Sequence, residues 1–287
     1  MTTHTDDLAF QALDEDGDPV WTWTEGAEIR PGLLAVDRLG VGHRCETWLV
    51  WVVEGWHPGV LKLPRPHQVD HPRARRSLAR EATALRAGSG HPALPRLLQD
   101  CSAAGDPLVL EEYLDGPSLA EVVDEVGALD PVEVALLGAH LLPALAVLHR
   151  AGLAHLDVKP ENIVLRDGRP FLVDLGSARP LGRPQPAGHP VGTVGYAAPE
   201  QEACAPVAAA MDLFGLGATL AEALAGIPYP EGPMLPDTPL TPLVTRLLAP
   251  DPEQRGPTPQ VLAELASAVG SERRPWPAWA EARLPVW

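Results

Sequence analysis

The chain has 287 residues, of which 45% are hydrophobic and 21% charged, a composition typical of a globular protein with one or two domains. It carries 38 acidic against 22 basic residues, for a net charge of −16. A surface with this charge repels phosphate backbones and anionic lipids, so we expect neither nucleic-acid binding nor membrane-surface binding.

Cysteine usage indicates a reducing compartment. Cys45, Cys101 and Cys204 are few, widely spaced and odd in number, which argues against a disulfide framework or a zinc site. The first residues show no signal peptide, and no apolar run reaches the roughly 18 residues of a membrane helix. The sequence therefore predicts a soluble, cytoplasmic protein without a membrane span.

The N-terminal region begins with acidic residues. Asp14, Asp16 and Asp18 alternate as in a calcium loop, but the downstream glutamate and the glycine at the sixth position are missing. We therefore predict an acidic turn rather than a calcium site. The alternation of Trp and Thr in 20–24 that follows is typical of a strand.

Three strands are predicted next, at Leu33–Leu39, Thr47–Glu54 and Gly59–Leu63. Gly40 and Gly42 lie between the first two. Glycines at such positions let the backbone approach a phosphate and direct N–H groups at it, although glycine pairs between strands are also common in ordinary turns.

Lys62 stands in the apolar third strand, where a buried lysine requires an anionic partner. Helical spacing over 72–88 places Glu81 on the face toward the sheet, which makes it the predicted partner of Lys62. The alternative is that Glu81 is an exposed glutamate that balances Arg80 or Arg86.

The chain then forms a predicted strand from Pro107 that runs into an extended crossover and ends at Gly116, the expected lobe boundary. An apolar helix should begin at Asp130-Pro131, where Asp130 is an N-cap and Glu133 completes a capping box. It should continue through Leu148, and Gly152 should end it.

A polar cluster follows this helix. Asp157, Lys159 and Asn162 lie close together, and Asp174 comes twelve residues later. A base, a cation, an amide and a second carboxylate are groups that phosphoryl transfer from a metal-bound nucleotide requires. Seen alone, the same residues could form an ordinary polar turn.

Downstream motifs fall in register with this cluster: Gly192–Tyr196, Ala198-Pro199-Glu200, Asp212 within Met211–Gly217, and Arg255. With these motifs the chain resembles a eukaryotic-type (Hanks-type) serine/threonine protein kinase of bacterial, actinobacterial-like type, over about residues 33–268. The resemblance implies a bilobal α+β fold, with a small β-rich N-lobe that carries one key helix and a larger, mostly helical C-lobe. The expected domains are an N-terminal extension with an extra strand (1–30), the N-lobe (31–115), the C-lobe (116–270) and a Trp/Pro-rich tail (271–287).

The resemblance also implies roles, with ATP and Mg²⁺ as cofactors. Catalytic roles fall to Asp157, Lys159, Lys62, Glu81 and Thr193. Nucleotide contacts fall to Gly40, Gly42, Lys62, Glu112 and Leu114, and metal ligation to Asn162 and Asp174. Asp157 would accept the proton of the substrate hydroxyl, and Thr193 would hydrogen-bond Asp157 and Lys159. Asp212 would brace the catalytic loop, His155 would be a packed structural histidine, and Glu200 would pair with Arg255.

Two departures from the family pattern concern the catalytic and glycine loops. Leu156 replaces the arginine that grips a phosphate on the activation segment, Asp174–Glu200, which has few hydroxyl groups. We therefore predict activity that does not depend on phosphorylation of this segment. Cys45 replaces the third glycine of the glycine loop. Its thiol could be inert or redox-sensitive, and both interpretations remain open.

Other departures concern the binding of substrates. Glu111 stands where access behind the adenine is controlled, an unusual place for a carboxylate. The segment between Asp212 and Arg255 is shorter than is usual in the family, and the missing part falls in the region that docks protein substrates. We therefore expect atypical recognition of the substrate. The tail tryptophans pack either on the kinase body or on a partner; they are Trp276, Trp279 and Trp287.

The expected activity is transfer of phosphate from ATP to serine or threonine of a protein substrate. A small-molecule kinase on the same fold is an alternative because the docking region is short, and the substrate-positioning segment argues against it. A nucleotide-binding pseudokinase or scaffold is another, which the full set of catalytic residues argues against.

Overall fold

The fold comes from a computed structural model, which describes residues 12–186 and 188–269. The chain divides into two compact units. The first holds residues up to Arg86 together with Arg96–Tyr113, and the second holds Ala87–Pro95 together with the chain from Leu114 onward. The first is β-rich with one long helix and the second is mostly helical, which agrees with the predicted α+β fold of two lobes. The tail tryptophans lie outside the described residues.

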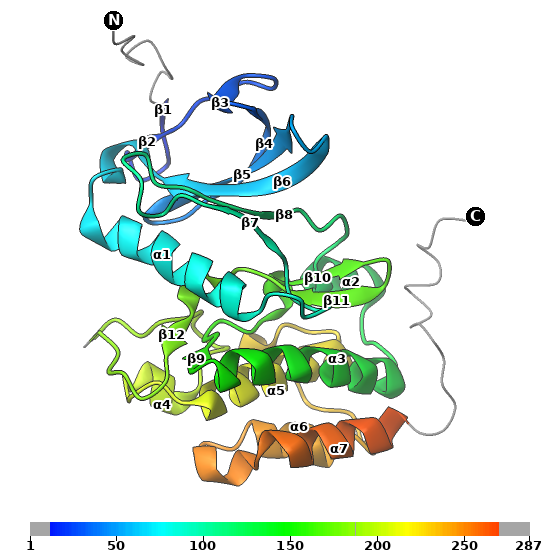
Figure 1. The fold of residues 1–287 in the computed structure, drawn as a ribbon. Coiled ribbons are helices and arrows are strands. Elements are labelled where there is room, and N and C mark those ends of the chain that lie inside the picture. Colours follow the sequence, from blue (N-terminus) through cyan, green and yellow to red (C-terminus); the bar gives the residue numbers. More distant parts are fainter. Residues whose placement is uncertain (1–11, 187, 270–287) are drawn as a thin grey trace, which may run out of the picture. The chain divides into compact units, whose positions relative to one another are not determined.

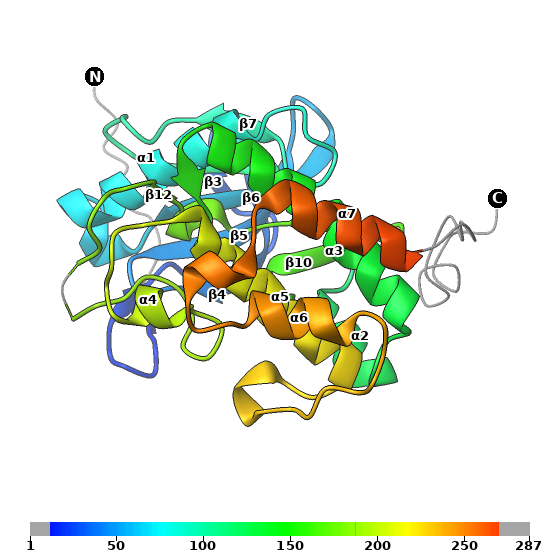
Figure 2. The same cartoon turned by 90° about the horizontal axis from the view of Figure 1, so that it is seen from below.

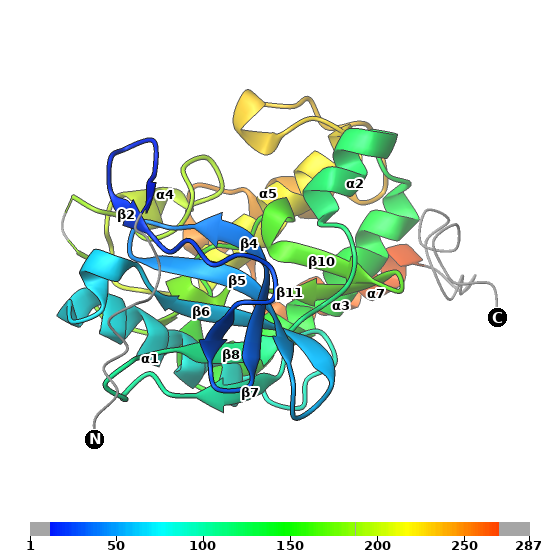
Figure 3. The same cartoon turned by 90° about the horizontal axis from the view of Figure 1, so that it is seen from above.

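A six-stranded antiparallel sheet forms the body of the first unit (Figure 3). In spatial order its strands are β3 (Glu28–Arg30), β4 (Leu33–Val41), β5 (Cys45–Val52), β6 (His57–Pro64), β8 (Val109–Glu112) and β7 (Leu97–Asp100). β5 alternates buried with half-buried residues, so one face of the sheet builds an apolar core that includes Trp48, Val50 and Leu61. The three predicted strands are confirmed, with ends shifted by no more than two residues.

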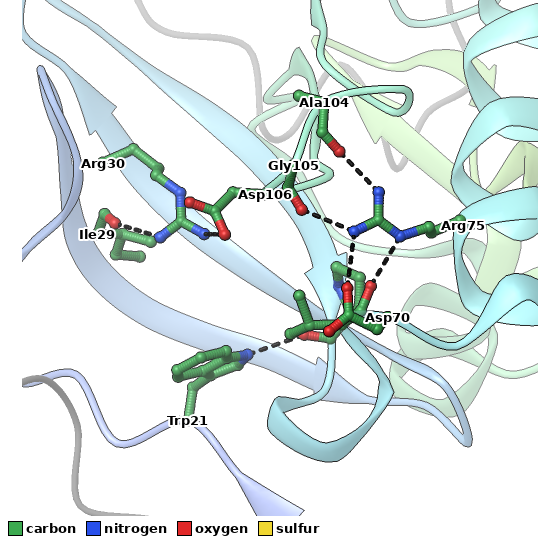
Figure 4. A network of polar contacts seen from close by, with 10 residues as sticks. Trp21, Ile29, Arg30, Asp70, Arg75, Ala104, Gly105 and Asp106 are labelled. Atoms are coloured by element: carbon green, nitrogen blue, oxygen red, sulfur yellow. Dashed lines mark hydrogen bonds and ion pairs between the residues drawn. The ribbon is translucent and has the colours of Figure 1, made fainter. Parts of the chain in front are cut away.

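Helix α1 (Pro72–Ala87) follows a 3₁₀ turn, η1 (Pro66–Gln68), and stops before Gly88 as predicted. Its first turn is fastened to the loop between β7 and β8 (Figure 4). The Arg75 guanidinium donates to the carbonyls of Ala104 and Gly105, each at 2.7 Å, and lies 3.2 Å from the Asp70 carboxylate. One planar cation thus joins two segments that are distant in sequence.

The N-terminal acidic residues form a turn, as predicted. Strands β1 (Ala12–Leu13) and β2 (Pro19–Val20) pair as a small hairpin. Within it, Asp14 accepts the N–H groups of Asp16 and Asp18 at 3.1 and 2.9 Å and pairs with Arg65 at 2.6 Å. The hydrogen bond from Asp18, with help from Arg65, lowers the pKa of the Asp14 carboxyl. The ionised carboxylate is therefore stabilised by an arginine and by backbone N–H groups.

The strand predicted from the Trp and Thr alternation is wrong, because only Val20 belongs to a strand. Trp21 and Trp23 instead stack on each other at 4.8 Å between ring centroids, and Trp23 meets the Trp48 ring edge to face at 5.1 Å. The Trp21 N–H donates to Glu46 at 2.9 Å. The alternation of Trp and Thr therefore belongs to a segment that packs on β5 but forms no strand pairing with it.

The second unit is built mainly of helices (Figures 1 and 2). They are α2 (Leu119–Val126), α3 (Pro131–Arg150), α4 (Pro199–Glu202), α5 (Ala209–Ala225), α6 (Thr241–Leu247) and α7 (Thr258–Val269). Short strands β9 (Leu153–Ala154) and β12 (Arg179–Pro180) pair, as do β10 (Ile163–Arg166) and β11 (Arg169–Leu172). The 3₁₀ turns are η2 (Pro160–Asn162), η3 (Leu175–Ser177), η4 (Tyr229–Glu231) and η5 (Pro252–Arg255).

Helix α3 is the centre of this unit and packs on both α5 and α7. Asp130 caps it as predicted, accepting the N–H of Val132 at 2.9 Å. At Gly138, a Cβ would lie 2.9 Å from a methyl of Leu265 and 3.2 Å from one of Leu220, so glycine permits the close helix contact.

In the described part of the chain, α3 is also the one helix long and apolar enough to cross a membrane by length and composition. The expectation that no apolar stretch reaches this length therefore does not hold for α3. Half of the tested stretch is buried, and the helix packs on α5 and α7, as a core helix does.

Candidate active site

Of the two glycines expected between the strands, Gly42 lies in the turn between β4 and β5, whereas Gly40 is still part of β4 and pairs with Thr47. Neither Gly40 nor Gly42 has a left-handed φ, so turn geometry does not require glycine at either position. A Cβ on Gly42 would lie 3.2 Å from the Cys45 carbonyl oxygen, whereas nothing in the described chain lies within 4 Å of a Cβ placed on Gly40. The absence of a side chain at 40 therefore fits a backbone that a phosphate can approach closely.

Lys62 on β6 forms the predicted ion pair with Glu81 on α1, and both side chains are buried. The structure adds a second carboxylate, because Glu111 Oε1 on β8 lies 3.6 Å from Lys62 Nζ. Strand pairing explains this neighbour: Val60 is the cross-strand partner of Glu111, and Lys62 projects from the same face of β6 two residues later. The lysine is thus oriented from two sides.

Cys45 begins β5 beside this pair. Burial, together with the negative charge of Glu81, raises the pKa of its thiol to about 12, although Lys62 and the nearby arginines oppose the shift. Because the thiolate is the reactive form, the inert interpretation is the one that the environment supports.

A variant in which Cys101 and Cys204 are replaced by serine isolates this thiol. At pH 7.5 Cys45 should react with iodoacetamide about 10³-fold more slowly than a thiol of ordinary pKa, since the pKa rise lowers the thiolate fraction by that factor. The same variant unfolded in urea should react at the ordinary rate. Equal rates in the folded and unfolded protein would contradict the inert assignment.

In the second unit, Asp212 on α5 holds the catalytic loop through hydrogen bonds to its backbone. Its carboxylate accepts the N–H groups of His155 and Leu156 at 2.9 and 2.7 Å and a hydrogen bond from His149 Nε2 at 2.7 Å. Burial alone would raise the pKa of Asp212, but these donors outweigh it and lower the pKa. The predicted brace is present, and His155 is fully buried as a structural histidine.

Asp157 is held in place at both carboxylate oxygens. Thr193 Oγ1 donates to Oδ1 at 2.7 Å, while Asn162 Nδ2 donates to Oδ2 at 3.2 Å and to the Asp157 carbonyl at 2.9 Å. Among the described residues no hydrogen bond joins Thr193 to Lys159, although the Thr193 hydroxyl oxygen could still accept one while its proton is donated to Asp157. Lys159 itself has extended backbone directly before η2.

Asn162 and Asp174 lie on neighbouring segments, since the Val173 N–H donates to the Asn162 carbonyl at 2.9 Å. Asp174 has φ +57°, a strained conformation for a non-glycine residue, and its side chain accepts the N–H of Gly176. With its amide N–H₂ engaged by Asp157, Asn162 can offer its side-chain oxygen to a metal. One amide oxygen and one carboxylate suit Mg²⁺, which completes its shell with phosphates and water.

Leu156 also has a left-handed φ, of +68°, and its side chain is buried. It belongs to an apolar cluster with Ala198, Met211 and Phe214, against which Val191 packs. The residue that replaces the phosphate-gripping arginine is thus a hydrophobic core residue between the catalytic loop and the activation segment.

Glu200 and Arg255 form the predicted ion pair, in bidentate geometry at 2.6 and 2.8 Å. Arg255 is completely buried, donates also to the carbonyls of Ala210 and Ala249, and lies 5.1 Å above the Phe214 ring. The pair anchors the end of the activation segment in the helical core.

The two remaining predicted nucleotide contacts fall on different units. Glu112 ends β8 in the first unit, and its carboxylate accepts from Arg96 Nε at 3.0 Å. Leu114 is buried at the start of the second unit.

Sequence reasoning missed three contributors to the site: Glu111 as a partner of Lys62, His149 as a donor to Asp212, and the buried Gln201. The contact of Glu111 with Lys62 could have been predicted, because side chains alternate between the two faces of a strand and the paired strands β6 and β8 place these two residues on the same face. His149 and Gln201 lie far in sequence from the residues they contact, and no local pattern marks them.

Comparison with known proteins identifies the same region. The family model described as "Protein kinase domain" matches residues 37–234. The probable serine/threonine-protein kinase PkwA of Thermomonospora curvata is 34% identical over 81% of this chain and 33% of its own length. Serine/threonine-protein kinase AfsK of Streptomyces coelicolor is 31% identical over 86% of this chain and 31% of its own length.

The chain therefore spans about a third of the length of these relatives. Among solved structures, a crystal structure of a kinase domain superposes with a TM-score of 0.70 over 87% of this chain and 98% of that chain. Its sequence identity of 17% supports the fold alone.

Proposed function

The chain belongs to the protein kinase family, and from that premise we propose that it transfers the γ-phosphoryl group of ATP to a serine or threonine hydroxyl of a protein, with Mg²⁺ as cofactor. The observation that carries this proposal is the geometry of Asp157. Its carboxylate is hydrogen-bonded by Thr193 on one oxygen and by Asn162 on the other, which fixes the orientation of a general base.

The residues of the chain divide the work as follows. Asp157 accepts the proton of the substrate hydroxyl, and Lys159 stabilises the negative charge that develops on the transferring group. Lys62, oriented by Glu81, binds the α- and β-phosphates, while Gly40 and Gly42 let the backbone cover them. Asn162 and Asp174 would hold Mg²⁺, which neutralises phosphate charge when it is bound.

Labelled ATP tests the proposal. The purified chain should transfer ³²P from the γ-position to serine or threonine of casein or myelin basic protein with Mg²⁺, and excess EDTA should abolish the transfer. Label on a metabolite of a lysate and not on protein would favour a small-molecule kinase. Nucleotide binding without any transfer would favour a pseudokinase.

We also propose that activity does not require phosphorylation of the activation segment. The place of a phosphate-binding arginine is taken by Leu156, whose side chain is buried among apolar residues. The hydroxyl of Thr193, which the family pattern makes structural, is already bonded to Asp157. An incoming phosphate at 193 would break that bond and place a second anion beside the base.

Treatment with a broad-specificity phosphatase tests this independence. After removal of the phosphatase, initial transfer rates should remain within about twofold of the untreated protein, because Leu156 offers no positive charge that a phosphate on the segment could pair with. A kinase known to require loop phosphorylation, treated in parallel, provides the control and should lose its activity. A loss of more than tenfold in this chain would contradict the proposal.

The kinase part of the protein is proposed to lie in the cytoplasm. Its three cysteines are free thiols in the structure, as expected for a reducing compartment.

A further inference from the structure

Two buried glutamines lie where the activation segment meets the catalytic loop. Gln201, in the single turn of α4, is 1% exposed, and Gln185, in the activation segment, is 8% exposed. Neither takes part in the chemistry proposed above. Because a buried amide requires partners for its polar atoms, the contacts of these side chains are informative.

The two side chains hold one residue of the activation segment from both sides. Gln185 Oε1 accepts the N–H of Val191 at 3.2 Å, and Gln201 Nε2 donates to the Val191 carbonyl at 2.5 Å. Gln185 Nε2 in turn donates to the carbonyls of Ala205 at 2.9 Å and Gln201 at 3.3 Å. We call this arrangement, of Gln185 and Gln201 around Val191, the glutamine clamp.

The clamp reaches the catalytic loop directly. Gln201 Nε2 also donates to the Leu156 carbonyl at 2.7 Å, so one amide group bridges the segment and the residue before Asp157. Two residues beyond Val191, Thr193 donates to Asp157 at 2.7 Å. The clamp therefore fixes the segment immediately next to the bond that orients the base.

Gly192 shows how closely the two segments approach. Its φ is +103°, and a Cβ there would lie 2.4 Å from the Leu156 carbonyl oxygen and 2.5 Å from Gln201 Nε2. A side chain at 192 would push the segment off the loop. The contact is thus built from backbone and neutral amides on both sides.

We propose that Gln201, supported by Gln185, is a positioning residue that presses the activation segment onto the catalytic loop so that Thr193 orients Asp157. Neutral amide hydrogen bonds join these two segments where no arginine is present to grip a phosphate. They involve no phosphate, so neither phosphorylation nor dephosphorylation is needed to form them. This inference rests on the proposed phosphoryl transfer.

A double-mutant cycle with Thr193 tests the proposal. Gln201→Ala should lower kcat by about 10- to 100-fold, since a misplacement of about 1 Å suffices for such a loss, with the KM for ATP within about twofold. If Gln201 acts through Thr193, then in a Thr193→Ala background the same change should cost less than about twofold. Equal losses in both backgrounds would overturn the proposal.

Two further variants separate the clamp from general folding. Gln201→Glu keeps the shape of the side chain but has no N–H donors at neutral pH, and it should lose as much kcat as Gln201→Ala. Gln260→Ala, an exposed glutamine on α7, is the matched control and should behave as wild type. A Gln201→Glu protein with wild-type kcat would exclude a role for the donated hydrogen bonds.

Hydrogen exchange provides a measurement that does not depend on transfer. In Gln201→Ala the amides of His189 and of residues 191–193 should exchange faster, while α3 and α5 keep their protection. Faster exchange throughout the second unit would indicate a purely structural role and overturn the proposal. If the wild-type chain transfers no phosphate, the proposed function fails, but this comparison still decides whether the clamp exists.

Discussion

Replacement of Asp157 by asparagine should lower kcat for phosphoryl transfer by about 10² to 10⁴-fold, the usual contribution of a general base. The amide oxygen can still accept the hydrogen bond from Thr193, but the group can no longer take up the proton of the substrate hydroxyl. Steady-state transfer of ³²P measures the loss. The KM for ATP and the thermal midpoint should stay near the wild-type values.

Asp167→Asn is the matched control. Asp167 is an exposed aspartate in the turn between β10 and β11, with a φ of +48° that asparagine tolerates well. This variant should transfer phosphate at the wild-type rate. An Asp157→Asn protein that keeps more than a tenth of the wild-type kcat would show that Asp157 is not the base.

Glu200→Ala should destabilise the fold by about 3–5 kcal/mol, the range found when one partner of a buried ion pair is removed. The change leaves the guanidinium of Arg255, which has 0% exposure, without its carboxylate in the helical core. Urea unfolding followed by far-UV circular dichroism measures the free energy. Arg255→Lys should also be destabilising, because an ammonium cannot bind Glu200 in bidentate fashion.

The pair of Arg246 and Glu264 provides the comparison within the same unit. Its distance is also 2.6 Å, but the two side chains are 25% and 39% exposed. Glu264→Ala should therefore cost less than about 1 kcal/mol. Similar losses for Glu200→Ala and Glu264→Ala would mean that burial does not set the strength of these pairs.

The residues that sequence analysis placed correctly are those whose partners follow from a local rule. A lysine in an apolar strand requires a counterion, and helical spacing turned Glu81 inward, so the pair with Lys62 could be predicted. Asp130 was recognised as an N-cap for a similar reason, because the rule involves only the next few residues.

The errors and omissions come from contacts that no local rule specifies. The alternation at Trp21 and Trp23 has a period of two, but this pattern fits an extended segment lying on a sheet as well as a paired strand. The glutamine clamp depends on how residues 185, 191 and 201 fold back on the catalytic loop, and a glutamine in a sequence shows no sign of such a contact.

The N-terminal segment has a practical consequence for where the protein can be cut. The kinase family model begins at residue 37, yet Trp21 lies before it. The Trp21 backbone N–H donates to the fully buried Glu46, and its indole N–H donates to the Pro64 carbonyl at 2.8 Å. The match to the family model ends at residue 234, before Arg255. A chain trimmed to the matched residues would remove the Trp21 hydrogen bond to Glu46 and leave the Glu200 carboxylate without Arg255, so the limits of the family match lie inside the limits of cooperative folding.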